Sequence, residues 1–189
     1  MRLLKRSQSG DDFKLKTVDD ENPPKYAILS HTWVGEEVTY NDFVGDTGKN
    51  KAGYQKIQFC GDQAVEDGLE YFWIDSCCID QSNMQELSTA INSMFRCYQR
   101  ASKCYVYLQD VSTLQRDTDS ECCSAVWGEA FRHSRWFTRG WTLQELLAPN
   151  DVAFFSKQGR WLGSRLSLER MIEGITGIPA SALRGQPLD

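Results

Sequence analysis

Residues 134–149 read SRWFTRGWTLQELLAP, and the rest of the chain is organised around them. We expect a loop that opens into a short helix, since Gly140 interrupts the preceding residues and Pro149 cannot continue a helix. Thr142 and Glu145 have the spacing of a capping box, in which each side chain satisfies a free backbone N–H at the start of the helix. Glu145 is therefore either a helix cap or a carboxylate at the mouth of a site, and spacing alone does not choose between them.

The composition of the whole chain is that of a soluble globular protein. The chain has 189 residues, which is enough for one domain with a buried core. Of these residues, 41% are hydrophobic and 25% are charged. A net charge of −5 gives no reason to expect a nucleic-acid partner. The first residues lack the apolar core of a secretion signal, and no apolar run reaches membrane-spanning length. We expect a cytoplasmic protein that does not enter a membrane.

The cysteines indicate a reducing compartment rather than a disulfide framework. There are seven of them, an odd number, and none is spaced as C-x-x-C. With only two histidines in the chain, this pattern argues against a zinc site. We expect free, mostly buried thiols and no metal.

Apolar runs and helical spacing alternate along the chain. The predicted buried strands are residues 26–30, 71–75, 103–108 and 152–155, with helical segments at 53–70, 84–98, 125–131 and 166–175. This order predicts one α/β domain over residues 1–189, with a parallel sheet and helices on both faces as a core over 25–189. Residues 1–24 are expected to form an N-terminal arm lying along it.

Three further segments carry local predictions. Residues 34–52 read as a long loop, and 112–123 as a polar insertion. Ser82 and Gln85 have the spacing of a second capping box. The helix that follows carries a stripe that we expect to lie in the core, made of Met84, Leu87, Ile91, Met94, Phe95 and Tyr98.

Polar residues follow the predicted strands. In open parallel sheets, ligands bind beyond the carboxyl ends of the strands, where the strand order reverses. Ser30, His31 and Trp33 come at or after the end of the first strand, and Asp75 and Cys77 at or after the end of the second. The helix that holds Glu145 starts at the same edge, so these residues are candidates for one site.

Three blocks of the sequence resemble the fungal heterokaryon incompatibility (HET) domain. They are AILSHTW at 27–33, WIDSCCID at 73–80 and FTRGWTLQEL at 137–146. The resemblance implies a role in fungal nonself recognition that ends in programmed cell death. It also implies a longer native protein, with a C-terminal NACHT and WD-repeat region, and an incompatibility partner protein.

A second resemblance concerns residues 141–146 alone. WTLQEL is similar to the W-C-L-x-E-L block of Toll/interleukin-1 receptor (TIR) domains, whose glutamate is catalytic in the TIR enzymes that cleave NAD. It implies a TIR-like, flavodoxin-like fold, NAD as a substrate without any further cofactor, and self-association, with segment 34–52 as a candidate contact. The alternative is a non-enzymatic death-signalling module that acts by self-association.

On this resemblance, Glu145 is the catalytic carboxylate beside an oxocarbenium-like ribose. The other candidates have a binding role and a structural alternative. His31 either contacts a ribose or phosphate or holds its loop, and Asp75 either orients a ribose hydroxyl or caps a turn. Arg139 pairs with the pyrophosphate or with a surface carboxylate.

Two tryptophans and a cysteine complete the candidate set. Trp33 and Trp141 either stack on a ring of the substrate or pack in the core. Cys77 could also form a Cys–His–Asp nucleophile set with His31 and Asp75, although no local protease signature accompanies it.

Overall fold

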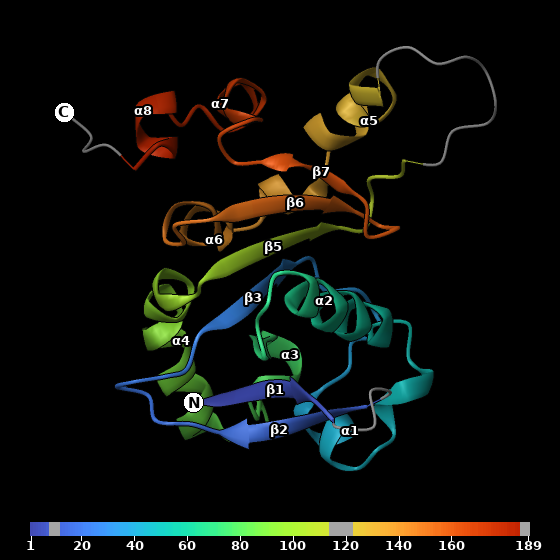
Figure 1. Ribbon diagram of the computed structural model, residues 1–189, viewed down its shortest axis with the longest axis vertical. Coiled ribbons are helices and arrows are strands. Elements are labelled where there is room, and N and C mark those ends of the chain that lie inside the picture. Colours follow the sequence, from blue (N-terminus) through green and yellow to red (C-terminus); the bar gives the residue numbers. More distant parts are fainter. Residues whose placement is uncertain (8–11, 114–122, 186–189) are drawn as a thin grey trace.

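The computed structural model describes residues 1–7, 12–113 and 123–185, with side chains from residue 127 onward in the last range (Figure 1). These residues form a seven-stranded sheet with the order β2-β1-β4-β3-β5-β6-β7. The strands are β1 Arg2–Arg6, β2 Phe13–Thr17, β3 Tyr26–His31, β4 Tyr71–Trp73, β5 Lys103–Leu108, β6 Val152–Ser156 and β7 Trp161–Ser164. The predicted central position of the 26–30 strand, between 71–75 and 103–108, is confirmed, although β4 ends two residues early.

The sheet is mixed, so the prediction of a parallel sheet is confirmed only for the four strands that the sequence predicted. The central strands β4, β3, β5 and β6 are parallel, whereas β1, β2 and β7 add antiparallel edges. Short connections account for the β1–β2 and β6–β7 pairs, because a few residues can join antiparallel strands but not parallel ones. The β6–β7 turn contains Gly159, whose φ of 72° favours glycine.

Residues 1–24 are not an arm along the domain, since they supply the β1–β2 hairpin. β1 pairs with β4, where Leu4 lies opposite Phe72. Leu3 and Leu4 are both fully buried, which means that both faces of β1 are covered. The hairpin is therefore part of the core.

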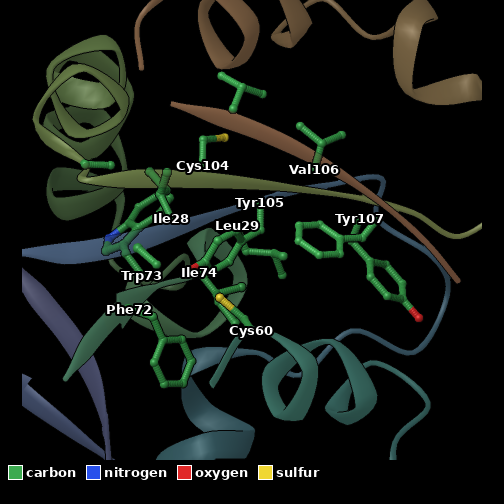
Figure 2. Packing of buried hydrophobic residues seen from close by; sticks show 14 of the residues in the cluster. Ile28, Leu29, Cys60, Phe72, Trp73, Ile74, Cys104, Tyr105, Val106 and Tyr107 are labelled. Atoms are coloured by element: carbon green, nitrogen blue, oxygen red, sulfur yellow. The ribbon is translucent and has the colours of Figure 1, made fainter. Parts of the chain in front are cut away.

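Helices lie on both faces of the sheet, as predicted. They are α1 Tyr40–Val44, α2 Tyr54–Glu66, α3 Asp75–Cys78, α4 Met84–Arg100, α5 Cys123–Arg132, α6 Thr142–Leu147, α7 Glu169–Thr176 and α8 Ala180–Leu183, with 3-10 turns η1 Gly48–Asn50 and η2 Arg135–Thr138. Figure 2 shows Tyr105 and Tyr107 on one side of β5 and Cys104 and Val106 on the other. Phe59 of α2 packs against both tyrosines, while Cys104 lies against the backbone of α6.

Two local predictions differ from the structure. Segment 34–52 is not a plain loop, because it holds α1, whose capping box is formed by Thr39 and Asp42, and η1. The second predicted capping box is also wrong, since Asn83 rather than Ser82 caps α4. The insertion at 112–123 lies almost wholly outside the described residues. The predicted end of the last long helix is confirmed by Gly177 in the left-handed conformation after α7.

The stripe on α4 is only partly in the core. Tyr98 is buried, but Met84 is 73% exposed and Phe95 50% exposed, and Ile91 is exposed as well. A helical period of 3.6 identifies an apolar face without saying how much of it the sheet covers. Helix α6, which packs against α4, exposes Leu143 and Leu147. We call the exposed set on these two helices the α4–α6 apolar face: Met84, Ile91, Phe95, Leu143 and Leu147.

Candidate functional site

Glu145 is a buried carboxylate held by three hydrogen bonds. The Ser30 hydroxyl, on the penultimate residue of β3, donates to Oε2 over 2.6 Å. The Arg139 guanidinium donates from Nη1 to Oε2 and from Nη2 to Oε1, both over 2.9 Å. Two-point pairing of this kind is among the strongest side-chain contacts in proteins. The carboxylate therefore joins the end of the central strand to the start of α6.

The capping box predicted for α6 is wrong. Trp141 occupies the N-cap position and makes no side-chain cap hydrogen bond. The Thr142 hydroxyl donates instead to the Trp136 carbonyl oxygen over 2.5 Å. The T-x-x-E spacing is present, but Thr142 is the first residue of α6 rather than its N-cap, and the Glu145 carboxylate pairs with Arg139.

Trp136 is a member of the site that the sequence argument did not single out. Its indole N–H donates to the Ser30 hydroxyl oxygen over 2.7 Å, and both residues are buried. A buried indole needs an acceptor. Trp136 lies with Arg139 in the stretch 134–149, and this position was the sequence signal that could have identified it as a site residue. Trp136 fixes the hydroxyl so that its proton points to Glu145.

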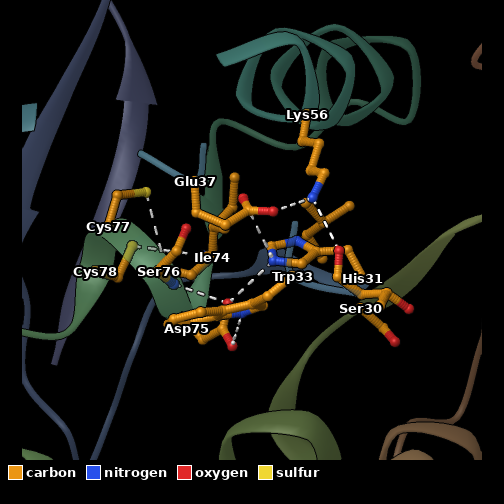
Figure 3. A network of polar contacts seen from close by, with 12 residues as sticks. Ser30, His31, Trp33, Glu37, Lys56, Ile74, Asp75, Ser76, Cys77 and Cys78 are labelled. Carbon is orange, nitrogen blue, oxygen red and sulfur yellow. Dashed lines mark hydrogen bonds and ion pairs between the residues drawn. The ribbon is translucent and has the colours of Figure 1, made fainter. Parts of the chain in front are cut away.

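A second cluster lies at the carboxyl ends of two strands, where His31 is the last residue of β3 and Asp75 is the second residue after β4 (Figure 3). The Trp33 indole N–H donates to Asp75 Oδ2 over 3.0 Å, and His31 Nε2 lies 3.5 Å from Asp75 Oδ1. Burial raises the pKa of Asp75 to about 6, and the charge of Glu145 adds to this effect. Burial and the nearby Lys56 and Arg139 charges hold the pKa of His31 well below its usual range, so the ring is neutral.

Neither ring nitrogen of His31 has a hydrogen-bond partner among the described residues. The ring is buried, and Glu37 Oε2 lies 4.0 Å from Nε2. Glu37 is itself bound by the Lys56 ammonium, which also donates to the Thr32 carbonyl over 3.0 Å. This buried ion pair holds the segment after β3, and no sequence pattern predicted it.

Cys77 stands apart from these clusters. It is fully buried in α3, and its thiol lies 3.9 Å from the Ile74 carbonyl oxygen. Burial holds the pKa of the thiol well above its usual range. Figure 3 shows it on the far side of Ser76 from His31. The structure does not bring Cys77 and His31 together, and a neutral buried thiol is a poor nucleophile.

Trp33 and Trp141, by contrast, are each nearly half exposed, and Arg139 and Asp75 are partly exposed. The candidate residues thus include one buried carboxylate, that of Glu145, and more accessible aromatic and charged side chains. Among the described residues, no three His, Cys, Asp or Glu side chains are grouped to hold a metal ion. No helix in the described ranges has the length and apolarity needed to span a membrane.

Comparison with known proteins identifies relatives of this chain. Residues 26–129 match the family described as "Heterokaryon incompatibility protein (HET)". The chain is 55% identical over 190 residues to the Vegetative incompatibility protein HET-E-1 of Podospora anserina. That match covers all of this chain and 14% of the relative, and no solved structure matches. The family match includes β3 and β4, while the Glu145 block is covered by the match to the relative. The chain belongs to the heterokaryon incompatibility (HET) family.

Proposed function

We propose that this protein is a fungal nonself-recognition effector domain that triggers cell death by cleaving NAD between nicotinamide and ribose. The supporting observation is the Glu145 carboxylate, paired with Arg139 and bonded to Ser30 at the carboxyl end of a central parallel strand. The strand order β4-β3-β5-β6 also supports a TIR-like, flavodoxin-like core, since flavodoxin-like sheets begin with the order 2-1-3-4.

The proposed chemistry needs one anion at the ribose. The bond from C1′ to the nicotinamide nitrogen breaks, and its electron pair stays on that nitrogen, so nicotinamide leaves as a neutral molecule. Glu145 stabilises the positive charge that develops on the ribose, an effect that is strong in a site shielded from water. Water then adds to C1′ and loses a proton to solvent. No cofactor is required.

The remaining candidates would bind the substrate. Asp75, whose side chain is 26% exposed, would orient a ribose hydroxyl, with His31 as a neutral neighbour. The exposed faces of Trp33 and Trp141 would stack on the base rings. We further propose that the domain acts in the cytoplasm, within a longer protein whose C-terminal NACHT and WD-repeat region responds to an incompatibility partner.

Nicotinamide release from NAD by the purified protein tests this proposal. Glu145→Gln should abolish release, because the amide carries no charge. Ile172→Ala is a matched control: it removes buried contacts in α7, at a cost of about 2–5 kcal/mol, without touching the site. At a temperature where both variants are folded, the control should retain activity. Wild-type protein that is inactive at every concentration, or active Glu145→Gln protein, would refute the hydrolase.

The α4–α6 apolar face favours a second candidate, a death-signalling module that works by binding a second copy of itself. The five apolar side chains of this face are exposed on two helices that pack together, and apolar side chains gathered on a surface typically mark interaction sites. Segment 34–52 is a further candidate contact. Analytical ultracentrifugation should show concentration-dependent assembly that is lost in Phe95→Ser. Assembly and killing that persist without NAD cleavage would support this candidate over the enzyme.

A further inference from the structure

The Arg139–Glu145 pair controls access to the candidate catalytic carboxylate. Both oxygens of Glu145 accept from the guanidinium, and Oε2 also accepts from Ser30. The Arg139 side chain is 20% exposed, whereas that of Glu145 is 4% exposed. A ribose can therefore reach the carboxylate only after the guanidinium has moved away.

Moving Arg139 alone is unfavourable. It would leave Glu145 as a buried anion with Ser30 as its remaining donor, and unpaired buried charges are strongly destabilising. Asp75 does not compensate for the lost positive charge, because it is also acidic. It lies close enough for the charge of Glu145 to affect its ionisation. The pair opens at low cost only when a ligand supplies a cation to Glu145 and an anion to Arg139 at the same time.

We propose that Arg139 exchanges Glu145 for a phosphate of the substrate, so that the site accepts N-ribosyl pyridinium nucleotides and discriminates against the corresponding nucleosides. This inference rests on the proposed NAD cleavage and deepens it. The guanidinium fork fits carboxylate and phosphate equally well, since each presents two oxygens. The pyridinium ribose brings the positive charge that replaces Arg139 beside Glu145. A nucleoside supplies the cation but leaves Arg139 without a partner.

Two shortened substrates that differ only in the phosphate test the exchange. Nicotinamide mononucleotide carries the phosphate and nicotinamide riboside lacks it. We expect kcat/KM for nicotinamide release to be at least about tenfold higher for the nucleotide, as for other sites built around a buried polar partner. Inorganic phosphite should increase cleavage of the riboside with saturation. Arg139→Gln should remove both effects, and Arg139→Lys should keep part of them, since it retains the charge without the fork.

Arg135→Gln is the matched control, because Arg135 is exposed on η2 in the same segment and makes no contact with Glu145. It should behave as wild type if the effect is not general electrostatic attraction. Equal kcat/KM for nucleotide and riboside in the wild type would overturn the exchange, as would phosphite activation that persists in Arg139→Gln. The comparison of nucleotide and riboside in the wild-type protein tests the exchange even if Arg139→Gln fails to fold.

Calorimetric binding separates this inference from the hydrolase proposal. If no substrate is cleaved, but the mononucleotide binds wild type more tightly than Arg139→Lys while the riboside binds both equally, the exchange holds and hydrolysis fails. If the mononucleotide shows no binding, or no preference for wild type, the exchange itself is refuted.

Discussion

Arg139 and Glu145 form a two-point ion pair across the turn between η2 and α6, with both N–O distances at 2.9 Å. The carboxylate is almost fully enclosed. The pair is a structural link and, under the exchange proposed above, also the closed state of the candidate site. Its two roles give different consequences for stability and for activity.

The first prediction concerns the stability of Glu145→Gln. Because the variant leaves Arg139 without its buried partner, we expect the free energy of unfolding to fall by about 3–5 kcal/mol, as when one half of a buried pair is removed. Urea denaturation measures this loss. The double variant Arg139→Gln/Glu145→Gln should recover part of it. A cost well under ~1 kcal/mol would contradict this prediction and show that the pair adds little to stability.

The second prediction concerns pH. The pKa of Asp75 is raised from 3.8 to about 6, so the folded protein holds this proton more tightly than the unfolded chain does. Its contribution to stability is fully present below the unfolded value and is lost as pH rises through about 6.

Asp75→Asn removes this titration and keeps an oxygen to accept from Trp33. The stability of the variant relative to wild type should therefore rise by roughly 2–3 kcal/mol between about pH 4 and 7. His31 is present in both proteins, so its own titration largely cancels in the difference. Unfolding curves at several pH values test this, and a difference independent of pH would contradict it.

A pair of substitutions on α4 tests how much of its apolar stripe is buried. Tyr98→Ala should cost about 3–5 kcal/mol, because the ring is buried against Trp73 and its hydroxyl donates to the Leu29 carbonyl. Phe95→Ser should cost less than ~1 kcal/mol, since the ring is half exposed. Thermal unfolding of the monomer at low concentration compares them. Equal losses would show that Phe95 is in the core after all.

The thiols should be reduced and should differ in reactivity. Cys60, Cys77, Cys78 and Cys104 are free and buried, while Cys97 is free and only partly buried. Among these five we expect Cys97 to react first with a thiol reagent, and the others only after unfolding. Peptide mass spectrometry without reductant measures both the redox state of the thiols and the order in which they are labelled. Cys97→Ser should remove the early label. Two or more native disulfides would contradict the prediction of reduced thiols.

The sequence alone determined the centre of the fold. The apolar runs that became β3 and β5 have almost no polar residues, so they had to lie inside a sheet covered on both faces. The alternation of elements then placed Ser30, Asp75 and Glu145 at one edge. The bond between Ser30 and Glu145, 115 residues apart, agrees with that reasoning.

Only the tertiary structure decided the partner of each side chain. The T-x-x-E pattern is local, but α6 begins at Thr142, so the threonine is not at the cap position and the carboxylate pairs with Arg139. The stripe on α4 gave the direction of an apolar face, but coverage of Phe95 depends on how far the sheet extends beneath the helix. Similarly, β1 lies in the sheet because the edge of β4 was free to pair with it. Local patterns report the intrinsic preference of a segment, whereas burial and pairing depend on neighbours that are distant in the chain.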